Sequence, residues 1–134
     1  MDSDTTGRDE ADWQQRLTPE QYRVLRKHGT ERAGSSPLNA EKRTGTFLCA
    51  GCGQKLFSSD NKYESGSGWP SFRAAIEGAV ATTTDRSFFM TRTEAHCSAC
   101  QGHLGHVFED GPQPTGLRYC MNGVAMRFEP DPTG

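Results

Sequence analysis

Two short stretches, CAGC at residues 49–52 and CSAC at residues 97–100, decide how this chain can fold. In each stretch two residues separate two cysteines, and this spacing lets both sulfur atoms turn toward one point. Four thiolates complete the tetrahedral shell of a zinc ion and leave no position open for water or substrate. The sequence therefore predicts one structural zinc ion (Zn²⁺) per chain, bound by Cys49, Cys52, Cys97 and Cys100.

The alternative is that the two pairs act as independent redox motifs or as free thiols. A redox CxxC motif of the thioredoxin type belongs to a βαβ unit, and the surrounding sequence does not indicate one. The segment between the pairs, residues 53–96, is longer than the gap of an ordinary zinc ribbon. Much of the domain is therefore expected to lie between the two metal-binding turns.

The composition suits a small domain that needs a bound metal ion for stability. The chain has 134 residues, of which only 33% are hydrophobic, so a thin core stabilised by a metal is expected. The net charge is −2 and no basic run stands out, which argues against nucleic acid as a partner. No stretch approaches the roughly 20 apolar residues of a membrane span, so no membrane association is expected.

The N-terminal stretch MDSDTTGRDEADW is acidic and has no apolar segment of the kind found in secretory signals. It also lacks the arginine-rich, acid-poor composition of a transit peptide. We therefore expect a cytoplasmic protein, whose thiols stay reduced and serve as metal ligands or reactive groups. Residues 1–12 are predicted to be a flexible tail and residues 13–134 a single domain.

One helix and a series of short strands are predicted from caps and turns. A capping box of Thr18 and Gln21, with a proline between them, predicts a helix that ends near His28. From residue 45 onward short apolar runs alternate with turn residues, which favours an antiparallel β domain behind a helical N-terminal region. The predicted strands are GTFLC, AVATTTD, SFFMTRTEAHC, HVFED, LRYCM and VAMRFEP, with a hairpin turn near Asp85 and Arg86.

The fifth cysteine, Cys120 in GLRYCMNG, is left over once four thiols are assigned to zinc. A single cysteine in a strand is most often a small buried apolar residue. It could instead be a nucleophile, because His103 and His106 lie upstream and an imidazolium lowers the pKa of a nearby thiol. Asn122 follows two residues later and would share a strand face with Cys120. The histidines could also flank the zinc site.

A glycine-rich stretch, SGSGWPSF at residues 65–72, leads into Trp69. In such a loop the indole could line a small apolar pocket. The alternative is that Trp69 anchors the loop onto the core, and this stretch by itself favours neither.

Five stretches, taken in order along the chain, resemble the B type of the methionine-R-sulfoxide reductase family: CAGC, SGSGWPSF, CSAC, GHLGHVFEDGPQPTG and RYCMNG. The resemblance covers residues 14–130. It implies a mainly β fold, in which two antiparallel sheets form a barrel-like core with short N-terminal helices and a structural zinc ion. It also implies a peptide-methionine (R)-S-oxide reductase that acts on oxidised proteins bearing methionine-R-sulfoxide.

By the same resemblance Cys120 is the nucleophile. Its thiolate would attack the sulfoxide sulfur, release methionine and become a sulfenic acid, the reversible first step of thiol oxidation. A histidine would supply the proton or orient a water molecule. The residues expected to surround the substrate are His103, His106 and Asn122 for the sulfoxide, Trp69 for the methyl group, and Arg118 beside the nucleophile.

One position departs from many family members. They carry a second cysteine in the SGxGW stretch, which attacks the sulfenic acid, and here that position is Ser67. The chain therefore resembles one-cysteine members, in which an external thiol (thioredoxin, glutaredoxin or a small thiol) reduces the sulfenic acid. Two other functions compete: a zinc-dependent protein-binding module of related fold, which needs only the four metal ligands, and a thiol hydrolase.

Overall fold

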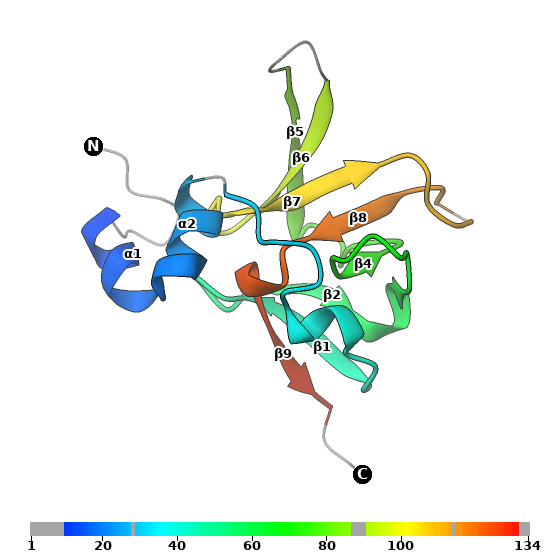
Figure 1. Ribbon diagram of the computed structural model, residues 1–134, viewed down its shortest axis with the longest axis horizontal. Helices are drawn as coiled ribbons and strands as arrows, with labels where there is room; N and C mark the ends of the chain where they lie inside the picture. The colour runs from blue at the N-terminus through cyan, green and yellow to red at the C-terminus, as the bar shows by residue number, and fades with distance from the viewer. Residues whose placement is uncertain (1–9, 28, 87–90, 114, 132–134) are drawn as a thin grey trace.

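The chain forms two antiparallel β-sheets with short helices from its N-terminal part beside them (Figure 1). The computed structural model describes residues 10–27, 29–86, 91–113 and 115–131. The helices are α1 (Glu10–Arg16), α2 (Pro19–Lys27) and the short 3-10 helices η1 (Pro37–Ala40), η2 (Ser59–Asn61) and η3 (Gly123–Ala125). The strands are β1 (Gly45–Cys49), β2 (Lys55–Ser58), β3 (Lys62–Tyr63), β4 (Ser71–Phe72), β5 (Val80–Asp85), β6 (Arg92–Cys97), β7 (His103–Phe108), β8 (Arg118–Met121) and β9 (Met126–Pro130).

The smaller sheet has the strand order β2-β1-β9, and the larger sheet has the order β3-β4-β8-β7-β6-β5. Each neighbouring pair is antiparallel. The prediction of a mainly β fold with two antiparallel sheets is therefore confirmed. The chain returns from the larger sheet to the smaller one through η3, which joins β8 to β9 (Figure 1).

Aromatic rings hold the two sheets together. Phe47 and Phe57 of the smaller sheet are fully buried, and their ring centroids lie 5.0 Å and 4.2 Å from that of Phe72 in the larger sheet. Tyr119 stands opposite Phe72 in the β4–β8 register and makes an edge contact with Phe57 at 5.8 Å. Because successive strand residues face opposite sides, Cys120 turns away from this aromatic core.

The predicted capping box begins α2. The Thr18 N–H donates to Oε1 of Gln21 at 2.9 Å, and the Gln21 N–H donates to Oγ1 of Thr18 at 3.1 Å. The predicted end of the helix at residue 28 lies outside the described residues. Val24 and Leu25 form the buried face of α2, which lies beside β7 (Figure 1).

Helix α1 is not predicted by the sequence pattern, and it begins at residue 10, inside the segment expected to be a tail. Trp13 accounts for it. The indole is only 2% exposed, and the guanidinium of Arg26 lies 4.6 Å from its ring centroid. Burial of so large an apolar side chain against α2 stabilises a helix that is too short to persist alone.

The predicted strands correspond to β1, β5, β6, β7, β8 and β9, with ends shifted by a few residues. The expected β5–β6 hairpin is present, with Val80 opposite Cys97, while residues 87–90 of the predicted strand lie outside the described part. The pattern does not predict β2, β3 or β4, because two to four residues are too few for a visible alternation. No helix among the described residues is long and apolar enough to cross a membrane.

Candidate active site and metal site

Four cysteine sulfur atoms gather where a strand of each sheet ends. Cys49 is the last residue of β1 and Cys97 the last of β6. The four Sγ atoms lie within 4.8 Å of one another, with 3.7 Å between Cys49 and Cys100 and 3.5 Å between Cys52 and Cys97. Bonds of about 2.3 Å place the tetrahedral sulfur ligands of zinc about 3.8 Å apart. The donor set therefore suits one tetrahedral metal ion, whereas a disulfide needs sulfur atoms about 2.0 Å apart.

The two metal-binding turns are built alike. Gly53 donates its N–H to the carbonyl of Cys49, and Gln101 donates to the carbonyl of Cys97, both at 2.9 Å. Both donors have positive φ, 84° at Gly53 and 67° at Gln101, which lets the chain reverse directly after each cysteine pair. A metal ion bound here would tie β1 of the smaller sheet to β6 of the larger one.

The chemistry of the cluster also favours a cation. A hydrogen bond with Cys100 is the largest effect on two of its neighbours: it lowers the pKa of Cys97 and raises the pKa of Cys49. The thiol groups are therefore close enough to change one another's pKa. A divalent cation would compensate the charge of four thiolates and displace the thiol protons.

Cys120 lies elsewhere, in the middle of the larger sheet. It stands on β8 directly opposite Ser71 of β4 and His106 of β7. Directly opposite residues in antiparallel strands point to the same face, with Cβ atoms about 4.5–5.5 Å apart. The strand register alone therefore puts a hydroxyl on one side of this thiol and an imidazole on the other.

An open cavity of about 330 Å³ lies over two residues of this row, Cys120 and His106. The described residues that line it are Thr30, Ser67, Trp69, Arg92, Gly105, His106, Phe108, Arg118, Cys120 and Asn122. Five of the residues predicted for the substrate site thus meet around one cavity. The sixth, His103, is not among the described residues that line it.

The two predicted histidines take different positions. His106 is partly exposed and lines the cavity, whereas His103 is 1% exposed and lies behind it, with the ring centroids 5.5 Å apart. Nδ1 of His103 lies 3.6 Å from Oε1 of Glu94 on β6. His103 is therefore placed to contact His106 and Glu94, and His106 is placed to contact a molecule in the cavity.

Trp69 and Asn122 are both held by Glu31, a residue that no sequence motif marks. The indole Nε1–H of Trp69 donates to the backbone carbonyl of Glu31 at 3.0 Å, and the backbone N–H of Glu31 donates to Oδ1 of Asn122 at 2.8 Å. These contacts join positions 38 and 91 residues apart in the sequence. A local pattern could not have indicated them.

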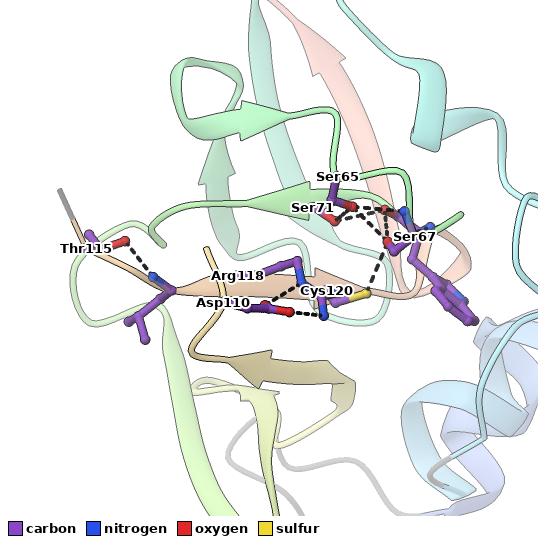
Figure 2. Close-up of polar contacts among 9 residues, drawn as sticks. Ser65, Ser67, Ser71, Asp110, Thr115, Arg118 and Cys120 are labelled. Atoms are coloured by element: carbon purple, nitrogen blue, oxygen red, sulfur yellow. Dashed lines mark hydrogen bonds and ion pairs between the residues drawn. The ribbon is translucent and has the colours of Figure 1, made fainter. Parts of the chain in front are cut away.

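Arg118 lines one side of the cavity together with Phe108, and its guanidinium is paired with Asp110. Its Nε and one terminal nitrogen donate to the two carboxylate oxygens of Asp110 at 2.9 Å and 3.2 Å (Figure 2). Its guanidinium also lies 4.4 Å from the ring centroid of Phe108. The hydrogen bond with Arg118 lowers the pKa of Asp110, so the pair keeps both charges near the thiol.

The family model described as "SelR domain" matches residues 17–130, which include both cysteine pairs and every residue of the cavity named above. The chain belongs to the SelR domain family. The family resemblance predicted from five short stretches is therefore confirmed over most of the chain.

Curated relatives of this SelR domain share the same printed name, peptide methionine sulfoxide reductase MsrB. The protein of Leptospira interrogans is 57% identical over 119 residues, 88% of this chain and 91% of that protein. The protein of Methanosarcina barkeri is 55% identical over 93% of this chain and 89% of its own length, and that of Agrobacterium fabrum is 50% identical over 97% of both. Among solved structures, the Mis18 'Yippee-like' domain matches with a TM-score of 0.55 at 19% identity, covering 68% of this chain and all of that one, which shows a shared fold.

In this SelR domain a hydroxyl group, that of Ser67, lies beside the cavity thiol. Its Oγ lies 3.7 Å from Sγ of Cys120 (Figure 2). Behind it, Oγ of Ser65 lies 2.8 Å from Oγ of Ser67 and 2.7 Å from Oγ of Ser71, whose hydroxyl donates to the carbonyl of Trp69 at 3.1 Å. A chain of hydroxyl groups thus leads away from the thiol at the position where the resemblance places a second cysteine in many relatives.

Proposed function

We propose that this chain reduces methionine-R-sulfoxide in proteins to methionine, with Cys120 as the nucleophile. One observation carries the proposal: the single thiol outside the four-cysteine cluster lies in a cavity with an aromatic ring, an imidazole and an amide. The names of the relatives give the reaction class, and the resemblance to B-type reductases gives the R epimer.

The proposed reaction takes place at the sulfur atom of the sulfoxide. The Cys120 thiolate attacks the electrophilic sulfur while a proton is delivered to the sulfoxide oxygen. The oxygen passes to the cysteine, so Cys120 is oxidised to a sulfenic acid and the sulfoxide is reduced to methionine. His106, directly across from Cys120 and on the cavity wall, is the group placed to deliver the proton.

Asn122 is suited to polarise the sulfoxide oxygen. Its Oδ1 already accepts from Glu31, and one hydrogen of its Nδ2 is donated to the carbonyl of Leu104 at 3.0 Å. The second Nδ2 hydrogen is the group that the side chain can offer to the cavity that it lines. Trp69 supplies an apolar face for the methyl group. One epimer is selected because the methyl group must face Trp69 while the sulfoxide oxygen faces Asn122.

Recycling of the sulfenic acid is proposed to depend on an external thiol. The four other cysteines gather in the metal cluster, and the group 3.7 Å from Sγ of Cys120 is the hydroxyl of Ser67, which cannot form a disulfide. A first thiol would displace water and form a mixed disulfide, and a second would release Cys120. Thioredoxin or another small dithiol is the reductant that we propose.

We further propose that the cluster of Cys49, Cys52, Cys97 and Cys100 binds one zinc ion. Its donor set is closed by four protein ligands, so the ion would stabilise the junction of the two sheets and take no part in the reaction. A reducing compartment suits a chain that depends on free thiols, and we place its work in the cytosol.

The test is an assay of the separate R and S epimers of a methionine sulfoxide peptide with dithiothreitol as reductant. The wild-type protein should reduce the R epimer, and Cys120→Ser should lose turnover while it keeps the wild-type thermal unfolding curve. Turnover in Cys120→Ser would refute the assignment of the nucleophile. A zinc-loaded wild-type protein that reduces neither epimer would favour the binding-module alternative.

A further inference from the structure

We infer that the Glu31 side chain is a positioning residue, whose carboxylate anchors the loop that holds Trp69 and Asn122 in place. This inference rests on the proposed function, because its consequence is a substrate pocket of fixed shape. The loop joins α2 to η1 and has neither helix nor strand over residues 29–36, so its own backbone pairing does not fix it.

The carboxylate of Glu31 is buried and bound by backbone groups. The side chain is part of a residue that is 3% exposed, and its two oxygens accept the N–H groups of Gly123 at 2.7 Å and Val124 at 2.9 Å. Both donors belong to η3, the turn that directly follows β8 and Asn122. Charged side chains are seldom so fully buried unless they are paired, so this placement marks a specific attachment of the loop to the end of β8.

The backbone of the same residue makes the two contacts that matter for the cavity. Its N–H donates a hydrogen bond to Oδ1 of Asn122. This bond fixes the orientation of the amide, so that a hydrogen of Nδ2 can face the cavity. Its carbonyl accepts the indole N–H of Trp69, which fixes the rotation of the ring about its long axis. Residue 31 therefore determines both the polar and the apolar wall.

A second contact ties the loop to the tryptophan side of the cavity. The Gly34 N–H donates to the carbonyl of Gly68, the residue before Trp69, at 2.6 Å. A Cβ on Gly68 would approach Cβ of Ala33 to 2.8 Å, so the two loops lie in close contact. Displacement of Glu31 from η3 would therefore shift the Trp69 loop as well, because the two move together.

Substitution of the side chain leaves the backbone N–H and carbonyl in place and removes only their anchor. Glu31→Ala deletes both acceptors, and Glu31→Gln keeps one acceptor but turns an amide N–H toward a backbone N–H. We expect graded losses of activity and of substrate preference, larger for Glu31→Ala than for Glu31→Gln. Glu77→Gln, the same chemical change on an exposed turn residue, is the matched control.

Three readouts on the 134-residue chain test the inference. The first is kcat/KM for the R epimer of a methionine sulfoxide peptide, and the second is the preference for methionine sulfoxide over ethionine sulfoxide, which has one more methylene. The third is hydrogen exchange of the indole N–H of Trp69, which is assigned with Trp69→Phe. Alkylation of Cys120 by iodoacetamide and thermal unfolding report the state of the nucleophile and of the fold.

In Glu31→Ala we expect kcat/KM to fall at least tenfold, the methionine-to-ethionine preference to shrink and indole exchange to accelerate at least tenfold, as a displacement of roughly 1 Å in a site allows. Cys120 alkylation should stay within about threefold of wild type, because the strand register that places the thiol is untouched. Glu31→Gln should lie between, and Glu77→Gln should match wild type.

Wild-type preference and wild-type indole exchange in a folded Glu31→Gln and Glu31→Ala would overturn the inference. Loss of the folded state in both variants would overturn it too, because Glu31 would then serve stability alone. If the wild-type protein reduces no sulfoxide, the proposed function fails, and indole exchange still decides whether Glu31 anchors the loop.

Discussion

Gly105, between the two histidines of GHLGHVF, is a position where one added methyl group should displace the nucleophile. It lies on β7, buried between Ala95 of β6 and Met121 of β8. A Cβ added there would lie 2.2 Å from the carbonyl oxygen of Cys120 and 2.9 Å from Cα of Met121. Both obstacles are backbone atoms, so rotation of a side chain cannot relieve the clash.

The size of the effect follows from these distances. Non-bonded carbon atoms rest about 3.5–4.0 Å apart, so β8 must move by roughly 1 Å or more at Cys120 to admit the methyl group. Added methylenes in a well-packed core cost about 1–3 kcal/mol of unfolding free energy. A misplacement of about 1 Å at a reacting group lowers the rate by about 100-fold. We expect Gly105→Ala to lose activity far out of proportion to its loss of stability.

The assay is urea unfolding together with kcat/KM for methionine-R-sulfoxide, measured on wild type, Gly105→Ala and Gly78→Ala. Gly78 has a φ of +78° and nothing within 4 Å of an added Cβ, so its alanine variant carries only local backbone strain, about 1–2 kcal/mol. That control should keep wild-type kcat/KM. A Gly105→Ala protein with kcat/KM within about twofold of wild type would refute the reasoning.

Three further predictions concern the metal cluster, the serine beside the nucleophile and the buried carboxylate. Cys97→Ser or chelation should abolish cooperative unfolding, because metal-binding free energies of about 10–16 kcal/mol become folding free energy; an unchanged melting curve of the metal-free protein would contradict this. Ser67→Cys places a thiol where an oxygen now lies 3.7 Å from Sγ of Cys120, so one turnover should form a disulfide and consume two titratable thiols with the metal retained. A full thiol count after turnover would argue against it. Burial raises the pKa of Glu31 and the hydrogen bonds from Gly123 and Val124 offset this only in part, so the folded state binds this proton more tightly than the unfolded state. In urea unfolding, wild type should therefore gain stability relative to Glu31→Gln as the pH falls from neutral toward 4.5, the ordinary pKa of a glutamate, and a pH-independent difference would exclude this linkage.

Much of the fold could be predicted because its signals are local. The two cysteine pairs, the Thr18–Gln21 capping box and the alternation in the longer strands each act within a few residues, and each appears where it was expected. Helix α1 could not be predicted, because it depends on burial of Trp13 against a separate helix.

The candidate site, too, could be predicted only where its signals are local. Residue types near Cys120 indicated the chemistry, yet the difference between His103 and His106 arises from strand pairing: only His106 faces Cys120 across β7 and β8. Glu31 was missed because its partners lie as far as 93 residues away along the chain. A buried carboxylate that binds backbone N–H groups has no sequence pattern of its own.

The row formed by Ser71, Cys120 and His106 makes enzymatic activity a measure of folding fidelity. Because side chains alternate along a strand, a slip of β8 by one residue would turn Cys120 into the aromatic core and bring Tyr119 or Met121 to the cavity face. Such a chain could keep its metal and its secondary structure and yet be inert. Turnover per mole of bound metal would then count the molecules whose strands are in register, which neither circular dichroism nor metal content can do.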